Sequence, residues 1–242
     1  MSPDHHARRV LDHVDALQQP MMRLVEQVVR IPSVSGTDGE NEGQSFMAAQ
    51  FAAAGLDVDH WRIDLDTITS QPTFPGMEVE RSEAWGLVGR RPGAGDGATL
   101  MLNGHIDVVP TGDPDAWPDA PFAATTRDGH VFGRGTCDMK AGLVAALWAA
   151  EAIRAAGVSL RGDLLVASVQ GEEDGGLGTY ATLDRGWRAD ACVIPEPTSM
   201  ALIPANSGAL TFRLRLRGEA THAARRLEGV SAIEKFLPIW AA

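Results

Sequence analysis

Four short motifs in the chain carry side chains of the types that bind metal ions and transfer protons. The motifs are NGHIDVVP at 103–110, GRGTCDMKAG at 133–142, QGEEDGG at 170–176 and PEPT at 195–198. Together they supply one imidazole and five carboxylates, namely His105, Asp107, Asp138, Glu172, Glu173 and Glu196. Zinc accepts nitrogen and oxygen ligands of this kind, and a shared carboxylate can hold two cations together. The series therefore indicates a hydrolytic zinc site, with a two-metal centre as its fullest form.

His105 and Asp107 are two residues apart in a segment that we expect to be a strand. Side chains two apart in a strand point to the same face, so both can serve one site. A carboxylate beside a metal-binding histidine fixes the histidine tautomer and raises its basicity. The alternative is a buried histidine with a charged neighbour, and for this motif alone that alternative is preferred.

Asp138 falls where a helix is expected to begin, after the glycines at 133 and 135 that permit a close approach. As an N-cap residue, it would accept hydrogen bonds from amides that have no helical partner. As a metal ligand, it could bridge two cations held about 3.5–4 Å apart. The motif alone does not decide between these two roles.

Glu172 and Glu173 follow a predicted buried strand and stand among glycines. One carboxylate can bind metal while its neighbour takes the proton of an attacking water and returns it to a leaving nitrogen. A solvated acidic turn is the alternative. Glu196 lies between two prolines that stiffen an extended backbone, and a rigid turn is its alternative. The ordered occurrence of all four motifs favours the metal site over these separate explanations.

The motifs follow short apolar runs that suit strands buried on both faces, namely AWGLVGR, ATLMLNG, DLLVASV and ADACVI. Residues 139–157 form a predicted helix rich in Ala and Leu. Strands that alternate with helices predict an α/β fold, a three-layer and mainly parallel sheet with helices on both faces. In such sheets, sites form beyond the carboxyl ends of the strands, and each motif lies at such an end.

The N-terminal region is expected to be mostly helical. Residues 6–30 predict a helix interrupted at Pro20, and residues 31–41 predict a loop. A second helix should run from about Glu42 to Ala54 and end near a glycine cap. GLDVDHWRID then alternates as a half-buried strand does, whereas residues 65–82 show no clear period.

The C-terminal region has a different pattern. ALTFRLRLRG at 209–218 alternates strictly between apolar and polar residues, which is typical of a one-sided strand in an antiparallel sheet. Residues 230–242 begin a helix in which Pro238 is unfavourable outside the first turn. We therefore expect an incomplete catalytic, metal-binding domain over 1–206 and the beginning of a second, α+β domain over 207–242.

Composition and charge exclude several classes of partner. The chain has 242 residues, 44% of them hydrophobic, and a net charge of −11, which disfavours binding to nucleic acid. No apolar run approaches the roughly 20 residues that span a membrane, and the N-terminus is too polar for a secretion signal. Cys137 and Cys192 form no CxxC motif, so we expect a cytoplasmic protein without a disulfide framework.

Taken together, the four motifs closely resemble those of a zinc-dependent family of deacylases and peptidases. The family includes acetylornithine deacetylase, succinyl-diaminopimelate desuccinylase, aminoacylase and carboxypeptidase G-type enzymes. The resemblance covers nearly the whole chain and implies a zinc-peptidase-like fold. It implies that His105, Asp138 and Glu196 bind one zinc ion and that Asp138 and Glu173 bind a second. Cobalt and manganese are the alternative ions.

The resemblance also implies roles for residues that do not bind metal. Asp107 would orient the histidine, Glu172 would be the general base, and the peptide bond between Asp138 and Met139 would be cis. ALTFRLRLRGEATHAA matches an inserted lid domain through which family members dimerise, so a homodimer is implied. His222 matches a lid histidine that in several members reaches the partner subunit's site and stabilises the reacting carbonyl oxygen.

The chain departs from this family in length and in one ligand. Family members continue after the lid with further strands and a last metal-binding histidine. None of the seven histidines of this chain matches that residue. We therefore expect a C-terminally truncated member with one complete zinc position and one incomplete position, which has Asp138 and Glu173 alone.

The resemblance implies a zinc-dependent amidohydrolase that cleaves N-acyl amino acids or small peptides with metal-activated water. EEDGGLGT and EPT resemble acetylornithine deacetylase and desuccinylase more than aminopeptidases. One alternative is a non-catalytic remnant that binds metal or a partner chain through its unfinished lid. Its apolar face would then be partly uncovered, with Leu210, Phe212, Leu214 and Leu216 exposed to association. The other alternative is an ordinary α/β protein with a coincidental acidic cluster.

Overall fold

The computed structural model describes residues 3–208 and 212–241. The chain divides into two compact units, one up to Ala201 and one from Leu202 onward. The first unit holds the four motifs, and the second holds His222. Because the two units are separate bodies, the arrangement inside each is described by itself.

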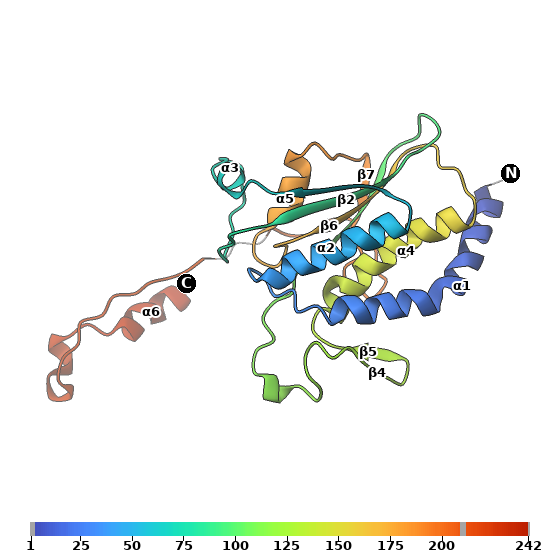
Figure 1. Cartoon of the computed structure of the whole chain (residues 1–242). Coiled ribbons are helices and arrows are strands. Elements are labelled where there is room, and N and C mark those ends of the chain that lie inside the picture. The colour runs from blue at the N-terminus through green and yellow to red at the C-terminus, as the bar shows by residue number, and fades with distance from the viewer. Residues whose placement is uncertain (1–2, 209–211, 242) are drawn as a thin grey trace. The chain divides into compact units, whose positions relative to one another are not determined.

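A five-stranded sheet forms the centre of the first unit, in the order β1-β2-β6-β3-β7 (Figure 1). The strands are β1 (Asp57–Arg62), β2 (Trp85–Arg91), β3 (Leu100–His105), β6 (Leu164–Val169) and β7 (Ala191–Val193). β3 pairs in parallel with β6 and β7, whereas β2 pairs antiparallel with β1 and β6. The α/β class is confirmed, but the sheet is mixed and not mainly parallel. An apolar run predicts burial and carries no signal for strand direction.

Three of the four apolar runs form largely buried strands, namely β2, β3 and β6. The prediction of burial on both faces is wrong for the run ADACVI, because every residue of β7 is exposed. Every residue of β6 is buried. Leu164 and Val166 belong to the main core, whereas Leu165 and Ala167 pack in a second cluster. Because successive side chains of a strand point to opposite faces, a strand with apolar residues on both faces requires a cover on each side.

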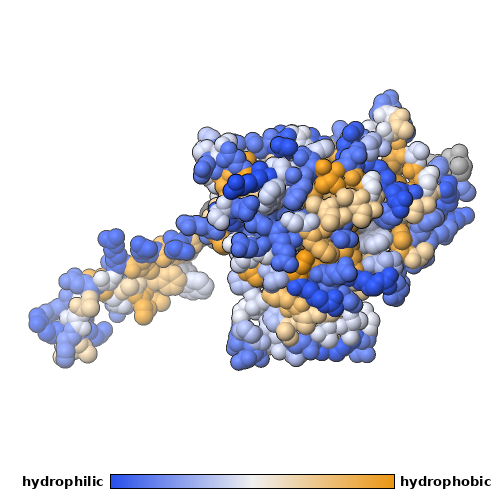
Figure 2. All heavy atoms as spheres, in the orientation of Figure 1, coloured by the Kyte–Doolittle hydropathy of each residue, from blue (hydrophilic) through white to orange (hydrophobic). Residues whose placement is uncertain are grey.

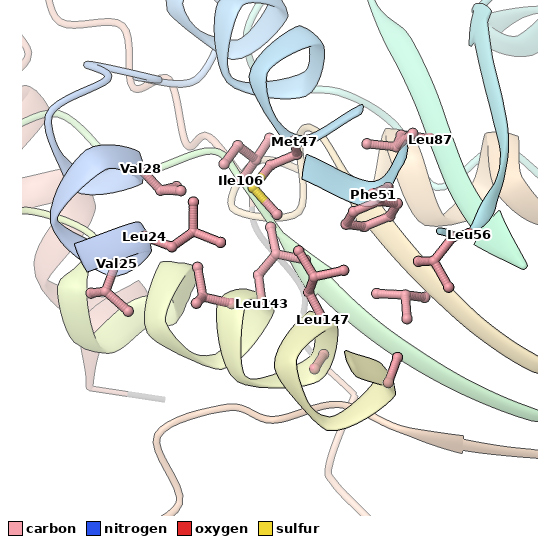
Figure 3. Close-up of a cluster of buried hydrophobic side chains, with 14 of the residues drawn as sticks. Leu24, Val25, Val28, Met47, Phe51, Leu56, Leu87, Ile106, Leu143 and Leu147 are labelled. Atoms are coloured by element: carbon pink, nitrogen blue, oxygen red, sulfur yellow. The ribbon is translucent and has the colours of Figure 1, made fainter. Parts of the chain in front are cut away.

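Helices provide that cover, as Figure 1 shows. α1 (Pro3–Val29), α2 (Asp38–Ala53) and α4 (Ala141–Ala155) lie on one face of the sheet, and α5 (Leu177–Asp184) lies on the other. Figure 3 shows the main core, where Met47 of α2 and Ile106 meet Leu24 of α1 and Leu143 of α4. The three-layer arrangement with helices on both faces is therefore confirmed.

Two helix boundaries differ from the sequence prediction. α1 continues through Pro20 without interruption, although proline lacks an amide donor and crowds the preceding turn. The buried stripe of Leu24, Val25 and Val28 packs against α4, and this packing outweighs the unfavourable proline. α2 begins at Asp38 and not near Glu42, since acidic residues in a first turn interact favourably with the helix dipole.

Smaller elements connect the sheet to the motifs. α3 (Leu65–Thr69) interrupts the segment expected to be irregular, and the Asp64 side chain caps it. β4 (Thr125–Arg127) and β5 (His130–Phe132) form a separate hairpin. The short helices η1 (Pro114–Ala116) and η2 (Thr136–Lys140) follow the HID and GRG motifs. Among the described residues, no helix has both the length and the apolar character required to cross a bilayer.

The second unit contains the short helix η3 (Ala223–Glu228) and α6 (Ala232–Trp240), which accommodates Pro238. The strand expected over 209–218 is not formed in its described part. Residues 212–218 have no regular structure, and residues 209–211 lie outside the described residues. A one-sided strand needs neighbours for its backbone hydrogen bonds. Within 202–208 and 212–241, the only such pairing is an isolated bridge between Glu219 and Val230.

Large apolar side chains of this unit are exposed. Figure 2 shows hydrophobic side chains gathered on the segment that Figure 1 labels α6. Ile233 and Trp240 expose 73% and 78% of their surface, and Phe212 exposes 76%. The apolar face expected at 209–218 is therefore uncovered at Phe212, while Leu210 lies outside the described residues.

Candidate metal centre

His105 is the last residue of β3, and its ring is fully buried. Its Nδ1 lies 2.8 Å from the main-chain oxygen of Asp107, whereas the nearer Asp107 carboxylate oxygen lies 3.6 Å away. A ring that donates through Nδ1 keeps the lone pair of Nε2 for a metal ion. The expected orientation of the ring is therefore provided by the carbonyl of Asp107 and not by its carboxylate.

Four carboxylates surround Nε2 of His105. Asp138 Oδ1 lies 3.0 Å from this nitrogen, and carboxylate oxygens of Glu172 and Glu196 both lie 3.8 Å from it. One atom each from His105, Asp138 and Glu173 lie within 4.8 Å of one another, and so do atoms from His105, Glu172 and Glu196. The structure thus brings the predicted metal ligands together near the ends of β3, β6 and β7, with Asp138 contributed by η2. Glu172 therefore lies as close to Nε2 of His105 as Glu196 does.

Asp138 lies in η2, at the bend between the GRG motif and α4. Its backbone is not helical, and the peptide bond to Met139 is cis, as the resemblance implies. The N-cap positions of η2 and α4 are Gly135 and Lys140, so Asp138 occupies neither. The carboxylate faces His105, so the N-cap alternative for this residue is not what the structure shows.

Lys140 is a residue that the sequence reasoning missed. Its side chain is completely buried, and its Nζ donates to the main-chain oxygens of Val28 and Ile31, at 3.1 and 2.7 Å. Burial lowers the pKa of this ammonium group to about 7, against the opposing charge of Asp107. Lys140 thereby ties the Asp138 bend to the C-terminus of α1. A lysine inside the GRGTCDMKAG motif, at the start of an Ala-rich helix, was the available signal.

The buried carboxylate of Asp107 has a different set of partners from the one expected. Its Oδ1 accepts from the amide of Glu172, and its Oδ2 accepts from the amide of Glu173, both at 3.2 Å. The hydroxyl of Ser35 also donates to Oδ2, at 3.2 Å. Asp107 therefore fixes the backbone on which the two glutamates stand. Ser35 lies in a predicted loop, and nothing local in the sequence indicates this contact.

The crowding of negative charge shifts the proton affinities of the cluster. Burial raises the pKa of Glu172, Glu173 and Glu196, and the negative charge of Asp138 raises each of them further. Burial lowers the pKa of His105, but the surrounding carboxylates outweigh it, and the pKa is raised overall. A divalent cation among these oxygens would relieve the repulsion. One imidazole nitrogen with several carboxylate oxygens is a donor set that zinc accepts, so the residues fit a metal ion.

His222 belongs to the second unit. Its Nδ1 accepts a hydrogen bond from the amide of Ala224 at 3.2 Å and caps the start of η3. The structure therefore gives this histidine a local role, and its assistance to a reacting carbonyl stays a prediction.

An α/β unit with this donor set at its strand ends defines the class of metallohydrolases, and comparison with known proteins identifies the family. The sequence profile of peptidase family M20/M25/M40 matches residues 101–233, more than half of the chain. The chain belongs to this family, and the resemblance drawn from the motifs is confirmed.

Curated relatives include enzymes from several bacteria. The chain is 31% identical to N-formyl-4-amino-5-aminomethyl-2-methylpyrimidine deformylase of Halalkalibacterium halodurans, over 95% of this chain and 53% of the relative. It is 34% identical to succinyl-diaminopimelate desuccinylase of Leptothrix cholodnii, over 85% of this chain and 52% of the relative. The chain therefore spans about half the length of the curated relatives that it matches.

Solved structures share the fold at lower sequence identity. Human carnosine dipeptidase 1 matches with a TM-score of 0.61 and 21% identity, over 77% of this chain and 40% of that chain. The dipeptidase Dug1p of Saccharomyces cerevisiae matches with a TM-score of 0.60 and 22% identity, over 71% and 36% respectively. These likenesses support the three-layer architecture of the first unit.

Proposed function

We propose that the chain carries the metal centre of an amidohydrolase, which cleaves the amide bond of N-acyl amino acids or small peptides with metal-activated water. The observation that carries this proposal is the cluster of four carboxylates around Nε2 of His105 at the strand ends. Family membership and the likeness to a deformylase and a desuccinylase support an amide substrate with a small acyl group.

In this proposal, His105, Asp138 and Glu196 hold one zinc ion, and Asp138 and Glu173 contribute to a second. Cobalt and manganese are the alternative ions. A bound zinc ion lowers the pKa of water and polarises the carbonyl of an amide. The bridging role falls to Asp138 because its side chain is 57% exposed, so one of its oxygens is open to a second cation.

Glu172 acts as the general base. Its side chain is 47% exposed, so it can reach a substrate as well as the cluster. Burial raises its pKa, which moves the carboxylate toward the range in which a group both accepts and returns a proton. Asp107 fixes the amide of Glu172, and the carbonyl of Asp107 orients His105. His222 is proposed to stabilise the reacting carbonyl oxygen of the substrate across a homodimer interface. The free cysteines Cys137 and Cys192 support a cytoplasmic location.

The test is hydrolysis of N-formyl, N-acetyl and N-succinyl amino acids by the chain with added zinc or cobalt. We expect turnover that a chelator abolishes and that returns with metal. Glu172→Gln keeps the shape of the side chain but cannot take a proton, so kcat should fall by about 10²–10⁴-fold while metal is retained.

A chain that binds metal and yet cleaves none of these substrates would contradict the proposal. That outcome would favour the non-catalytic alternative, in which the chain only binds metal or a partner. The relatives named above are enzymes, and this favours the catalytic interpretation. Family membership together with the convergence of the motif residues argues against a coincidental acidic cluster.

A further inference from the structure

A buried ion triad lies beside the turn that carries Glu172 and Glu173. Arg81 stands in the segment before β2, Glu40 in the first turn of α2, and Asp174 directly after the two glutamates. The side chains of Arg81, Glu40 and Asp174 expose only 1%, 2% and 5% of their surface. The guanidinium donates to both oxygens of Glu40 at 2.8 and 2.9 Å, and to both oxygens of Asp174 at 2.7 and 2.8 Å.

Every donor of this guanidinium has an acceptor. Its remaining N–H donates to the main-chain oxygen of Val79 at 3.2 Å. The carboxylates are satisfied as well, because Glu40 accepts from the amide of Gly171 at 3.2 Å and Asp174 accepts from the amide of Val79 at 3.0 Å. A planar fork is needed to bind two carboxylates in this way, and a lysine ammonium cannot reproduce it.

The network holds the turn Gly171–Asp174 at both ends. The first amide of the turn donates to Glu40, and the last side chain of the turn binds Arg81. The two amides between them donate to Asp107. Gly171 has a φ of +65°, a conformation that favours glycine, and a Cβ at this position would lie in tight contact with Nη2 of Arg81, at 3.1 Å.

We infer that Arg81 is a positioning residue that fixes the turn Gly171–Asp174 and thereby directs Glu172 and Glu173 toward His105. The inference rests on the proposed function, because it concerns the proposed base and a proposed metal ligand. Replacement of a whole buried ion pair often changes stability little, but removal of one partner leaves an uncompensated buried charge, here on Glu40 and Asp174 beside the turn. A fully satisfied polar network also specifies one conformation of the segments that it joins. Loss of Arg81 should therefore loosen the turn far more than the sheet.

The test is amide hydrogen exchange, measured by mass spectrometry on the full chain without metal or substrate. Arg81→Met removes the charge and the fork, and Arg81→Lys keeps the charge alone. Arg90 provides the matched control, because it is an arginine of β2 that binds Asp163 at 2.6 Å, before the start of β6. Arg90→Met therefore removes, and Arg90→Lys alters, an ion pair that does not contact the turn.

We expect Arg81→Met to speed exchange over residues 171–176 by about ten-fold, equal to about 1.4 kcal/mol of opening free energy. Arg81→Lys should give a smaller increase. Exchange in β6 should stay at the wild-type rate, and neither Arg90 variant should change residues 171–176. Cobalt affinity, measured from the visible absorption of the bound ion, should fall in the Arg81 variants alone.

Three outcomes would overturn the inference. The first is wild-type exchange over 171–176 in both Arg81 variants, and the second is an equal loss of protection throughout β6. The third is a loosened turn with unchanged cobalt affinity, which would leave Arg81 without influence on the site. If Arg81→Met does not fold, Arg81→Lys decides. Exchange needs no turnover, so an inactive wild-type chain would refute the proposed function and leave this test intact.

Discussion

At the scale of single residues, the main-chain carbonyl and the side-chain carboxylate of Asp107 organise the site. Its main-chain oxygen lies 2.8 Å from Nδ1 of His105, and its carboxylate binds the amides of Glu172 and Glu173. One residue therefore fixes the imidazole and the backbone of two glutamates. The side chain and the main chain can be separated by mutation, because a substitution at Asp107 leaves its carbonyl in place.

Asp107→Asn should disturb the turn and spare the histidine. The amide nitrogen of asparagine replaces one acceptor oxygen, so one buried backbone N–H of the turn is left unpaired. We expect a loss of about 1–3 kcal/mol in the free energy of unfolding, measured with urea on the metal-free chain. Asp59→Asn is the control, since Asp59 binds Arg185 near the surface, where such pairs contribute about 1 kcal/mol or less. Equal losses in the two variants would contradict this account of Asp107.

At the scale of elements, the site depends on the junction between α1, η2 and α4. Lys140 bridges this junction by donating to Val28 and Ile31 near the C-terminus of α1. These hydrogen bonds connect the bend that carries Asp138 to α1, which lies more than a hundred positions earlier in the chain. A basic group near a helix C-terminus also interacts favourably with the helix dipole.

The pH dependence of stability should report on Lys140. Burial lowers its pKa to about 7 in the folded chain, below the value of a lysine in an unfolded chain. Between about pH 7 and the ordinary pKa of a lysine, the unfolded chain therefore binds more protons than the folded chain does. The free energy of unfolding should rise with pH across this range. The neutral amine keeps two N–H donors, enough for both carbonyls.

Lys140→Met should lack this rise, and it should be less stable than wild type by about 1–3 kcal/mol because two buried carbonyls lose their donor. Urea unfolding at a series of pH values measures both effects. Arg154→Met, at an exposed position on α4, is the control and should follow the wild-type pH profile. A parallel profile for Lys140→Met would show that this lysine does not titrate in the folded chain.

The elements also show how far the sequence predicts this fold. The strand-forming runs and the motif residues could be predicted because periodicity and motif spacing are local properties. The direction of β2 and the continuity of α1 through Pro20 could not, since both follow from packing against distant segments. For the same reason the roles of Arg81 and Lys140 could not be predicted, because their hydrogen-bond partners lie far away in the sequence. Residues 212–218 show the converse, because strict alternation does not form a strand without a neighbour.

At the scale of the whole molecule, the chain has a well-packed first unit and a second unit with little core. The described part of the second unit has no buried residue, and α6 exposes Ile233, Leu237 and Trp240. Exposed apolar patches of this kind mark surfaces that associate. The chain also spans about half the length of its curated relatives, so activity and assembly of a whole enzyme stay proposals.

The apolar face of α6 should drive self-association of the chain. Ile233→Glu combined with Leu237→Glu places charge on that face and should shift the sedimentation of the chain toward a monomer. Arg226→Glu, on an exposed residue of η3, is the control for a change of charge alone. A wild-type chain that stays monomeric at all concentrations would contradict the prediction.

The central claim is that the residues around His105 form a metal centre, and calorimetric titration of the metal-free chain with zinc tests it most directly. We predict saturable binding to the wild-type chain and a loss of about 100-fold or more in affinity for His105→Ala, because the imidazole is the only nitrogen ligand in the cluster. His130→Ala, at an exposed histidine of β5, should bind as wild type does. Absence of zinc binding, or equal affinity in wild type and His105→Ala, would contradict the account.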